Sequence, residues 1–283
     1  MAEVIFVKKD SARKIPLALK KVGLKKFAGK EVLVKLHMGE ENNKWYVKPN
    51  IVKIVFDEMK KIKSEPFLFD TVVLYRGSRD SKEKYMAVAR QHGFTAIGCE
   101  VVIGDEGTRV KMEDCGIKFS YEVVKELYRT KDVVAISHAK GHVLTGFCGA
   151  IKNFGMGGVS KRSKLEMHAA STLKKFLSLG TAKTAFDRIL ALGAKACLAG
   201  KNVLYMNVLL DITRECDCVN DALPIICKDL GFLFSSDPVA VDAASVEMIQ
   251  KNAGNVFERD PWEHIRFAEK IGLGSMKYEL VEI

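Results

Sequence analysis

Short hydrophobic runs alternate along this chain with amphipathic stretches whose apolar positions recur every three to four residues. The runs predict strands and the stretches predict helices. The expected strands cover residues 4–7, 31–36, 69–75, 99–103, 133–137, 203–210, 231–234 and 278–281. The expected helices cover residues 15–27, 49–63, 81–92, 119–129, 165–177, 184–199, 238–251 and 261–271. This alternation predicts an α/β fold with a largely parallel sheet and helices on both faces.

A chain of 283 residues can form one large core or two modest ones. We expect a single domain over residues 1–283, and the alternative is a pair of lobes, residues 1–130 and 131–283. Ligands of parallel sheets bind beyond the carboxyl ends of the strands. Residues that directly follow a predicted strand are therefore the first candidates for a site.

The most informative segment runs from Ser137 to His168 and starts where the strand at 133–137 ends. Its six glycines between Gly141 and Gly158 let the backbone approach a ligand and offer amide N–H groups to an anion. The segment has no Gly-x4-Gly-Lys-Ser/Thr motif, so it is not a nucleotide P-loop of that type. We expect it to bind a carboxylate or phosphate, and the alternative is a tightly packed crossover loop with surface lysines. The expected binding residues are Lys152, Gly149, Asn153 and Gly155.

Histidine is scarce, with six in the chain, yet three histidines bracket this loop. A neutral imidazole ligates metals and moves protons near neutral pH. We expect His138 and His168 to ligate a metal and His142 to move a proton. His37 follows another predicted strand, and Glu40 lies three residues beyond it. This pair is expected to share the catalytic work, and the alternatives are half of a metal site or a polar lid.

Two further motifs follow predicted strands. Cys216 and Cys218 are two residues apart and can supply two ligands to a soft metal, so other residues must complete that site. Arg79 can fork onto a carboxylate or phosphate of a cofactor. The alternative for Arg79 is a surface charge in the first turn of a helix.

Composition narrows the class of protein. Seven scattered cysteines without a Cys-x-x-Cys pair predict free thiols rather than a disulfide framework or the usual ferredoxin spacing. No apolar run reaches the roughly 18 residues that span a bilayer, and the N-terminus has no secretory leader, so we expect a cytoplasmic protein without a membrane partner. The net charge of +10 favours a small anionic ligand. Nucleic acid is not the expected partner, because the lysines are spread along the chain and no binding motif accompanies them.

Five strings in this sequence resemble the domain of unknown function 362 family. They start at His37, Tyr75, Gly146, Glu215 and Ser236, in the family's order and over nearly the whole chain. Many members of this iron–sulfur-related family carry a ferredoxin-like insert with two four-iron clusters just after the position of His168. Here residues 169–201 contain only Cys197, so a four-iron cluster is not expected.

A fainter resemblance is to the catalytic domain of the lactate racemase family, which uses a nickel-pincer nucleotide. Lys152 follows His142 by ten residues, and His168 follows Lys152 by sixteen, which is similar to the family's spacing. The resemblance implies that the lysine is tethered to the cofactor, the last histidine ligates nickel and the first is an acid or base. The family's Asp-x-Thr-Arg-Pro motif is absent, and its Gly-x-His-Arg turn is present only as Gly77-Ser78-Arg79. We expect a shared fold and site location rather than racemase activity.

The leading hypothesis is a protein that binds a divalent transition metal or a cofactor, with enzymatic action on a small carboxylate or phosphate left open. If a pincer-type nucleotide is present, hydride transfer at a 2-hydroxy acid becomes a candidate reaction. The alternatives are a non-enzymatic metal carrier or assembly factor that uses Cys216 and Cys218 and, on net charge alone, a nucleic-acid-binding protein. The identity of the metal, the substrate and the oligomeric state stay open.

Overall fold

The computed structural model describes residues 1–173, 181–219 and 224–283. Its strands are β1 (Ala2–Lys8), β2 (Glu31–Lys35), β3 (Glu65–Thr71), β4 (Val101–Gly104), β5 (Gly107–Asp114), β6 (Ile117–Val124), β7 (Asp132–His138), β8 (Lys140–His142), β9 (Gly146–Cys148), β10 (Asn202–Leu209), β11 (Ile212–Thr213), β12 (Ile225–Cys227), β13 (Gly231–Ser235) and β14 (Tyr278–Glu282). Its α-helices are α1 (Ile15–Lys21), α2 (Pro49–Lys61), α3 (Lys82–Gln91), α4 (Lys125–Arg129), α5 (Ala150–Gly155), α6 (Lys161–Ser171), α8 (Ala182–Leu198), α9 (Pro238–Ala253) and α10 (Glu263–Lys270). Three 3-10 turns, η1 (Lys9–Lys14), η2 (Leu24–Phe27) and η3 (Phe94–Ala96), complete the described elements.

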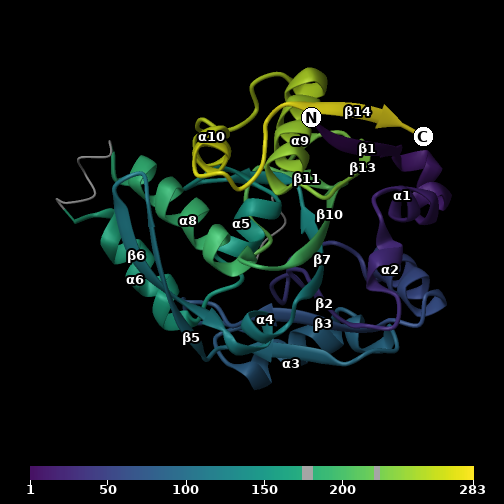
Figure 1. Ribbon diagram of the computed structural model, residues 1–283, viewed down its shortest axis with the longest axis horizontal. Helices are drawn as coiled ribbons and strands as arrows, with labels where there is room; N and C mark the ends of the chain where they lie inside the picture. Colours follow the sequence, from purple (N-terminus) through teal and green to yellow (C-terminus); the bar gives the residue numbers. More distant parts are fainter. Residues whose placement is uncertain (174–180, 220–223) are drawn as a thin grey trace.

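Eight strands form one sheet in the order β14-β1-β13-β10-β7-β2-β3-β4 (Figure 1). The pairs from β10 to β4 are parallel, and β1 is parallel to β14. Only β13 runs against its neighbours β1 and β10. The prediction of a largely parallel sheet is therefore confirmed.

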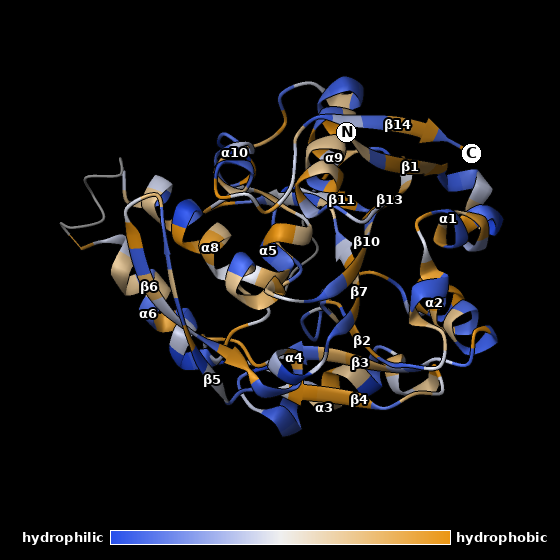
Figure 2. Cartoon of the chain, in the orientation of Figure 1, coloured by the Kyte–Doolittle hydropathy of each residue, from blue (hydrophilic) through white to orange (hydrophobic). Residues whose placement is uncertain are grey.

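The sheet is covered on both faces because its strands bury alternate residues on opposite sides. In β7, Val133 and Ala135 belong to one core, whereas Val134 and Ile136 belong to the other. The first core packs under α5, α8, α9 and α10, and the second under α1, α2 and α3. Figure 1 shows α5 and α8 on one side of the sheet and α1 and α2 on the other. In Figure 2, β4 and much of β7 are hydrophobic, while the helices are hydrophilic where they face outward.

One predicted helix is wrong. Residues 119–129 form the end of strand β6 and only one short helix, α4. Tyr121, Val124 and Leu127 have helical spacing, but residues 117, 119, 121 and 123 also alternate and pair with the polar strand β5 in a hairpin. The pairing with β5 determines the structure of these residues, because side-chain contacts between paired strands stabilise the hairpin more than helical spacing alone stabilises a short helix.

Several boundaries also shift. The strand expected at 69–75 is β3, which ends at Thr71, and the helix expected at 165–177 starts already at Lys161, with Ser160 as its N-cap. The expected helix 15–27 is split after α1, where Gly23 has a φ of 88° that an L-residue rarely adopts. Residues 174–177 of the expected helix lie outside the described residues.

Strands from both halves of the chain share this sheet. β2 lies between β3 and β7, so the sheet crosses the boundary of the alternative lobes 1–130 and 131–283. The single domain over residues 1–283 stays a prediction, and one continuous sheet supports it.

Candidate functional site

A cavity of about 270 Å³ opens at the carboxyl ends of β2, β3 and β7, and Cys216 and Cys218 reach it from the segment that follows β10 and β11. Parallel α/β sheets bind ligands at this edge, and the volume is near the lower end of the range for small-molecule pockets. Segments far apart in sequence meet there, because the sheet places β7 between β2 and β10. The expected site residues that line it are His37, Arg79, His138, His142, Gly149, Lys152, Asn153, His168, Cys216 and Cys218. Glu40 and Gly155 are not among the lining residues.

Helix α5 aims Lys152 into this cavity. The Asp242 carboxylate, on α9, accepts hydrogen bonds from the backbone N–H groups of Ala150 (2.6 Å) and Ile151 (2.9 Å) and so caps the start of α5. Burial raises the pKa of Asp242 to about 6. Lys152 then lies with its Nζ 3.4 Å from Cys216 Sγ. Asp242 therefore fixes the position of the lysine from a different segment of the chain.

Adding a methyl group at Gly149 is expected to displace this cap. An alanine Cβ at Gly149 would lie 2.2 Å from Asp242 Oδ1, so Gly149→Ala should lower the free energy of unfolding by about 1–3 kcal/mol. Urea denaturation followed by circular dichroism measures this change. Gly77→Ala is the control, since its nearest contact would be an ordinary 3.8 Å to Tyr75. Equal stability of the two variants would contradict this account of the cap.

Three cysteines gather beside Lys152. One ligand atom each of His142, Cys148 and Cys216 lies within 4.8 Å of the other two, and all three side chains are buried. Hydrogen bonds from the Cys148 and Cys218 thiols, with help from Lys152, hold the pKa of Cys216 well below its usual range. The cluster thus presents one thiolate and two thiols to the cavity. Cys148 was not among the expected site residues, although it lies inside the glycine-rich segment.

Backbone donors fix the position of the proton on the imidazole of His142. The Leu144 and Thr145 backbone N–H groups donate to Nδ1, each at 3.2 Å, which places the ring proton on Nε2. The Thr145 hydroxyl donates to the Phe147 carbonyl and lies 3.1 Å from the same Nδ1. Metal binding releases protons from its ligands, so a metal at Nε2 would displace the proton carried there. Burial lowers the pKa of His142 well below its usual range, so the ring is neutral.

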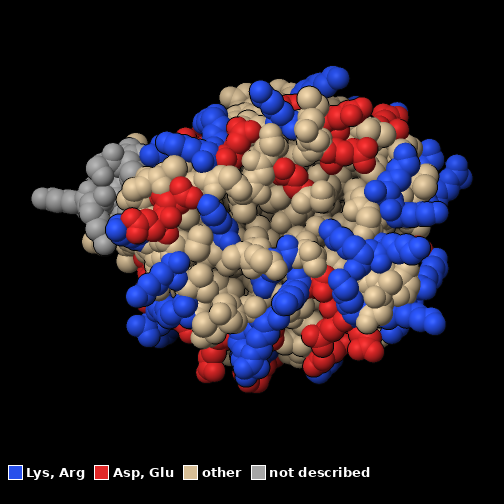
Figure 3. All heavy atoms as spheres, viewed as in Figure 1, with Lys and Arg blue, Asp and Glu red and all other residues tan. Residues whose placement is uncertain are grey.

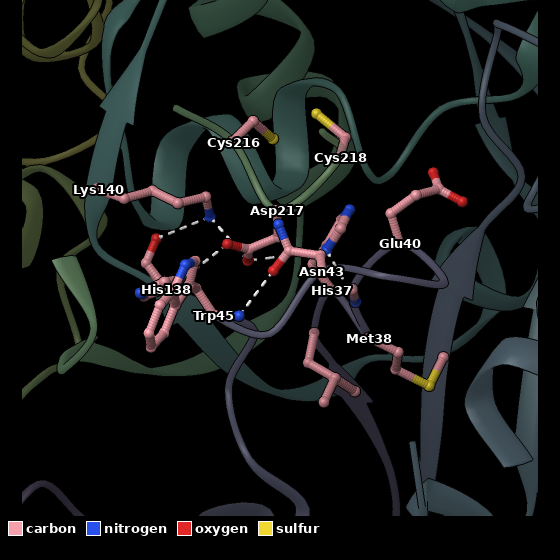
Figure 4. Close-up of polar contacts among 12 residues, drawn as sticks. His37, Met38, Glu40, Asn43, Trp45, His138, Lys140, Cys216, Asp217 and Cys218 are labelled. Atoms are coloured by element: carbon pink, nitrogen blue, oxygen red, sulfur yellow. Dashed lines mark hydrogen bonds and ion pairs between the residues drawn. The ribbon is translucent and has the colours of Figure 1, made fainter. Parts of the chain in front are cut away.

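Asp217 holds the loop that carries Cys216 and Cys218 (Figure 4). Its carboxylate is 2.8 Å from His138 Nδ1 and 3.0 Å from Lys140 Nζ, and the side chain is fully buried. Burial raises the pKa of Asp217, but His138 and Lys140 outweigh this effect and hold the pKa below its usual range. The residue between the two cysteines is therefore an ionised anchor.

His138 contributes to this anchor. Its Nδ1 faces the Asp217 carboxylate and its Nε2 faces the Leu210 carbonyl oxygen at 2.8 Å. Both ring nitrogens are therefore engaged by acceptors of the protein itself, and neither is open to a metal. We therefore leave His138 out of the ligand set proposed below.

Arg79 is fully buried and ties together the residues of the predicted catalytic pair. Its Nε donates to Glu40 Oε2 at 2.9 Å, and its Nη1 lies 2.7 Å from His37 Nε2. Burial and the nearby guanidinium lower the pKa of His37 to about 3, so this ring is neutral at physiological pH. Tyr75 also donates to Glu40, at 3.0 Å. Glu40 is thus the counter-ion of Arg79, and His37 accepts from the same guanidinium.

His168 projects from α6, and its ring stacks on Phe186 with centroids 4.7 Å apart. Asn153, on α5, accepts from Lys35 Nζ at 2.8 Å and donates to Ser137 Oγ at 2.9 Å. Gly155 packs against the backbone of α8, where a Cβ would come within 2.4 Å of the Leu190 carbonyl oxygen. Gly155 therefore serves helix packing beside the site.

Charge on the surface is mixed. In Figure 3, Lys and Arg cluster at the edge where α1 and α2 lie, while Asp and Glu are interspersed over the rest of that face. The expectation that nucleic acid is not a partner stays a prediction. Among the described residues, no helix has the length and apolar character needed to cross a membrane.

The fold and the cavity define an α/β protein with a histidine, cysteine and lysine site at the carboxyl edge of its sheet. Residues 32–247 match the family model described as Domain of unknown function (DUF362), and the chain belongs to this family.

Two solved structures share the fold. The lactate racemase apoprotein from Thermoanaerobacterium thermosaccharolyticum is 16% identical with a TM-score of 0.51, over 73% of this chain and 51% of that one. A protein from Thermotoga maritima is 13% identical with a TM-score of 0.50, over 92% of this chain and 59% of that one. This chain thus matches little more than half the length of either, and at these identities the similarity concerns the fold alone. The comparison with curated proteins yields no match.

Proposed function

We propose that this protein is an enzyme that holds a divalent transition metal through His142, Cys148 and Cys216 and acts on a small carboxylate or phosphate in the cavity. The observation that carries the proposal is the approach of three buried ligand atoms to within 4.8 Å of one another on the wall of that cavity. Imidazole and thiolate together suit zinc, nickel, copper or iron. When bound, such a metal supplies Lewis-acid chemistry to the ligand.

The side chains around the cluster have separate tasks. Lys152 balances the charge of the Cys216 thiolate, and Asp217 fixes the loop on which the thiolate lies. Neutral His37, held by Arg79, offers a polar wall that does not repel a cation. Burial of all three ligands favours a resident metal over a cargo that is handed to a partner, because exchange requires access to the ligands.

The test is metal content in a set of cysteine variants. Protein purified without oxygen and without a nickel column is expected to hold close to one equivalent of metal by mass spectrometry, and Cys216→Ser is expected to hold less than about a tenth of that. Cys99→Ser is the matched control, because Cys99 is a half-buried thiol outside the cavity. Dialysis against a chelator separates the two classes of function: a resident metal stays, and a carrier loses it. Equal metal in Cys216→Ser and Cys99→Ser would refute the ligand set.

A second candidate is a nickel-pincer nucleotide tethered to Lys152 with His168 as a metal ligand. One observation favours it: His142, Lys152 and His168, which resemble the lactate racemase residues in order and spacing, all line the same cavity. Within the part of the chain that the structure describes, the ring nitrogens of His168 have no hydrogen-bond partner, and the ring lines the cavity, so these residues fit such a group. The substrate class would then include 2-hydroxy acids. Intact-protein mass spectrometry checks for a covalent adduct on Lys152.

A further inference from the structure

The buried cations that line the cavity differ in whether they have an anionic partner. Four of them have an anionic partner: Lys35 pairs with Asp70 at 2.7 Å, Arg79 with Glu40 at 2.9 Å, Lys140 with Asp217 at 3.0 Å, and Lys152 with the Cys216 sulfur at 3.4 Å. Lys164 also lines the cavity and is 4% exposed. Within the described ranges of the chain, no carboxylate comes within 4.0 Å of its Nζ. Among the described residues that line the cavity, Lys164 is thus the buried cation without a carboxylate or thiolate partner.

The ammonium of Lys164 is fixed in place but not neutralised. Its Nζ donates to Thr71 Oγ1 at 2.7 Å and to the Val72 carbonyl oxygen. Thr71 in turn donates to the Gly157 carbonyl at 3.2 Å, so the hydroxyl presents a lone pair to the lysine. Two of the three ammonium protons have neutral acceptors, and the third has none among the described residues.

The charges around Lys164 do not balance its positive charge, so its surroundings favour a bound anion. Asp70 and Asp105 act on it favourably from a distance, while Lys35 and Arg79 repel it. Asp70 is already paired with Lys35 through a buried ion pair. Burial is the largest effect and lowers the pKa of Lys164 to about 7. An unpaired buried ammonium is costly, and an oxyanion beside it would remove that cost.

We propose that Lys164 is the recognition point for the oxyanion of the ligand, a carboxylate or phosphate that completes the missing ion pair between β3 and α6. This inference rests on the proposed function, because it places the ligand in the same cavity as the metal cluster. Lys164 thus donates the charge-assisted hydrogen bond that orients the ligand. Lys152 does not, because its ammonium is already balanced by Cys216.

Calorimetric titration with glycolate, and separately with inorganic phosphate, tests the proposal on the purified protein. Lys164→Met is expected to weaken binding about 10- to 100-fold, the range for loss of one charge-assisted hydrogen bond. Lys161→Met is the matched control, since Lys161 is on the same helix and does not line the cavity. Glycolate and phosphate together show which oxyanion the cavity prefers.

Proton uptake on binding distinguishes a lysine that contacts the ligand from one that only supports the fold. With a pKa lowered to about 7, Lys164 is mostly neutral at pH 8, so binding of glycolate should be accompanied by uptake of a proton through this residue. Titrations in two buffers of different ionisation enthalpy count the protons. Lys164→Arg should keep the binding and lose the uptake, because guanidinium stays charged.

The outcomes separate this inference from the proposed function. Unchanged binding and uptake in Lys164→Met overturn the inference, as does wild-type protein that binds neither probe. Metal content measured on the same samples reports on the cysteine cluster independently. Weakened binding in Lys164→Met with metal retained supports both. Binding that depends on Lys164 in protein that never holds metal supports the inference and refutes the metal site.

Discussion

Replacing Asp217 by alanine is expected to lower the free energy of unfolding by about 3–5 kcal/mol, the cost of leaving a buried charge without its partner. The Asp217 carboxylate bonds both His138 and Lys140, and its backbone carbonyl accepts from the Glu40 N–H at 3.0 Å. Without the carboxylate, Lys140 remains buried and charged. The loop with Cys216 and Cys218 also loses its tie to β7 and β8, so we expect metal binding to weaken with stability.

The pH dependence of stability tests whether the ionised Asp217 carboxylate is the cause of this loss. The folded pKa of Asp217 is depressed, so its contribution is complete above the unfolded pKa of about 3.9 and is lost as the pH falls below it. The stability difference between wild type and Asp217→Asn should therefore be full at pH 7 and shrink in the acid range. Chemical denaturation at several pH values measures this. Asp57→Ala is the control, because its pair with Lys53 is on the surface and is expected to contribute less than about 1 kcal/mol. A constant difference at all pH values would contradict the assignment.

The position of the site could be predicted because it depends on the strands and on the residues directly after each strand. Hydrophobic runs located β2, β7 and β10 to within a few residues. A parallel sheet then places His37, His142 and Cys216 at one edge, whatever conformation the loops adopt.

The partners inside the site could not be predicted. Cys148 and Cys216 are 68 residues apart, and nothing near either one indicates that their sulfurs meet. In the sequence, Asp217 looks like a solvent-exposed loop residue. Only the folded structure shows that His138, at the end of β7, and Lys140, in β8, enclose its carboxylate. Lys35 and Lys164 look like surface lysines in sequence, yet both are almost completely buried. Such contacts depend on the crossing of distant segments rather than on local spacing.

Lys152→Met distinguishes the two candidate functions, and we expect the variant to bind metal about tenfold more tightly than the wild type. Lys152 Nζ and a metal on the cysteine cluster would share the Cys216 sulfur. A single and a double positive charge about 5 Å apart repel by on the order of 7 kcal/mol at an effective dielectric constant of about 20. Removing Lys152 also removes a group that keeps Cys216 ionised, and this offsets much of the gain in metal affinity. The offset is incomplete, because a bound metal deprotonates its own thiol ligands.

Competition with a chelator of known affinity measures this change, with the surface variant Lys53→Met as the control. A nickel-pincer nucleotide tethered to Lys152 predicts the opposite result, since methionine offers no amine for the tether. In that case the variant folds normally but loses the cofactor, the metal and the covalent mass on Lys152 together. Tighter metal binding therefore supports ligation by the protein's own histidine and cysteines, and joint loss of metal and adduct supports the tethered cofactor. The two functions make opposite predictions for this one side chain, because a free Lys152 ammonium repels a metal ion, whereas the Lys152 amine would be the attachment point of a tethered cofactor.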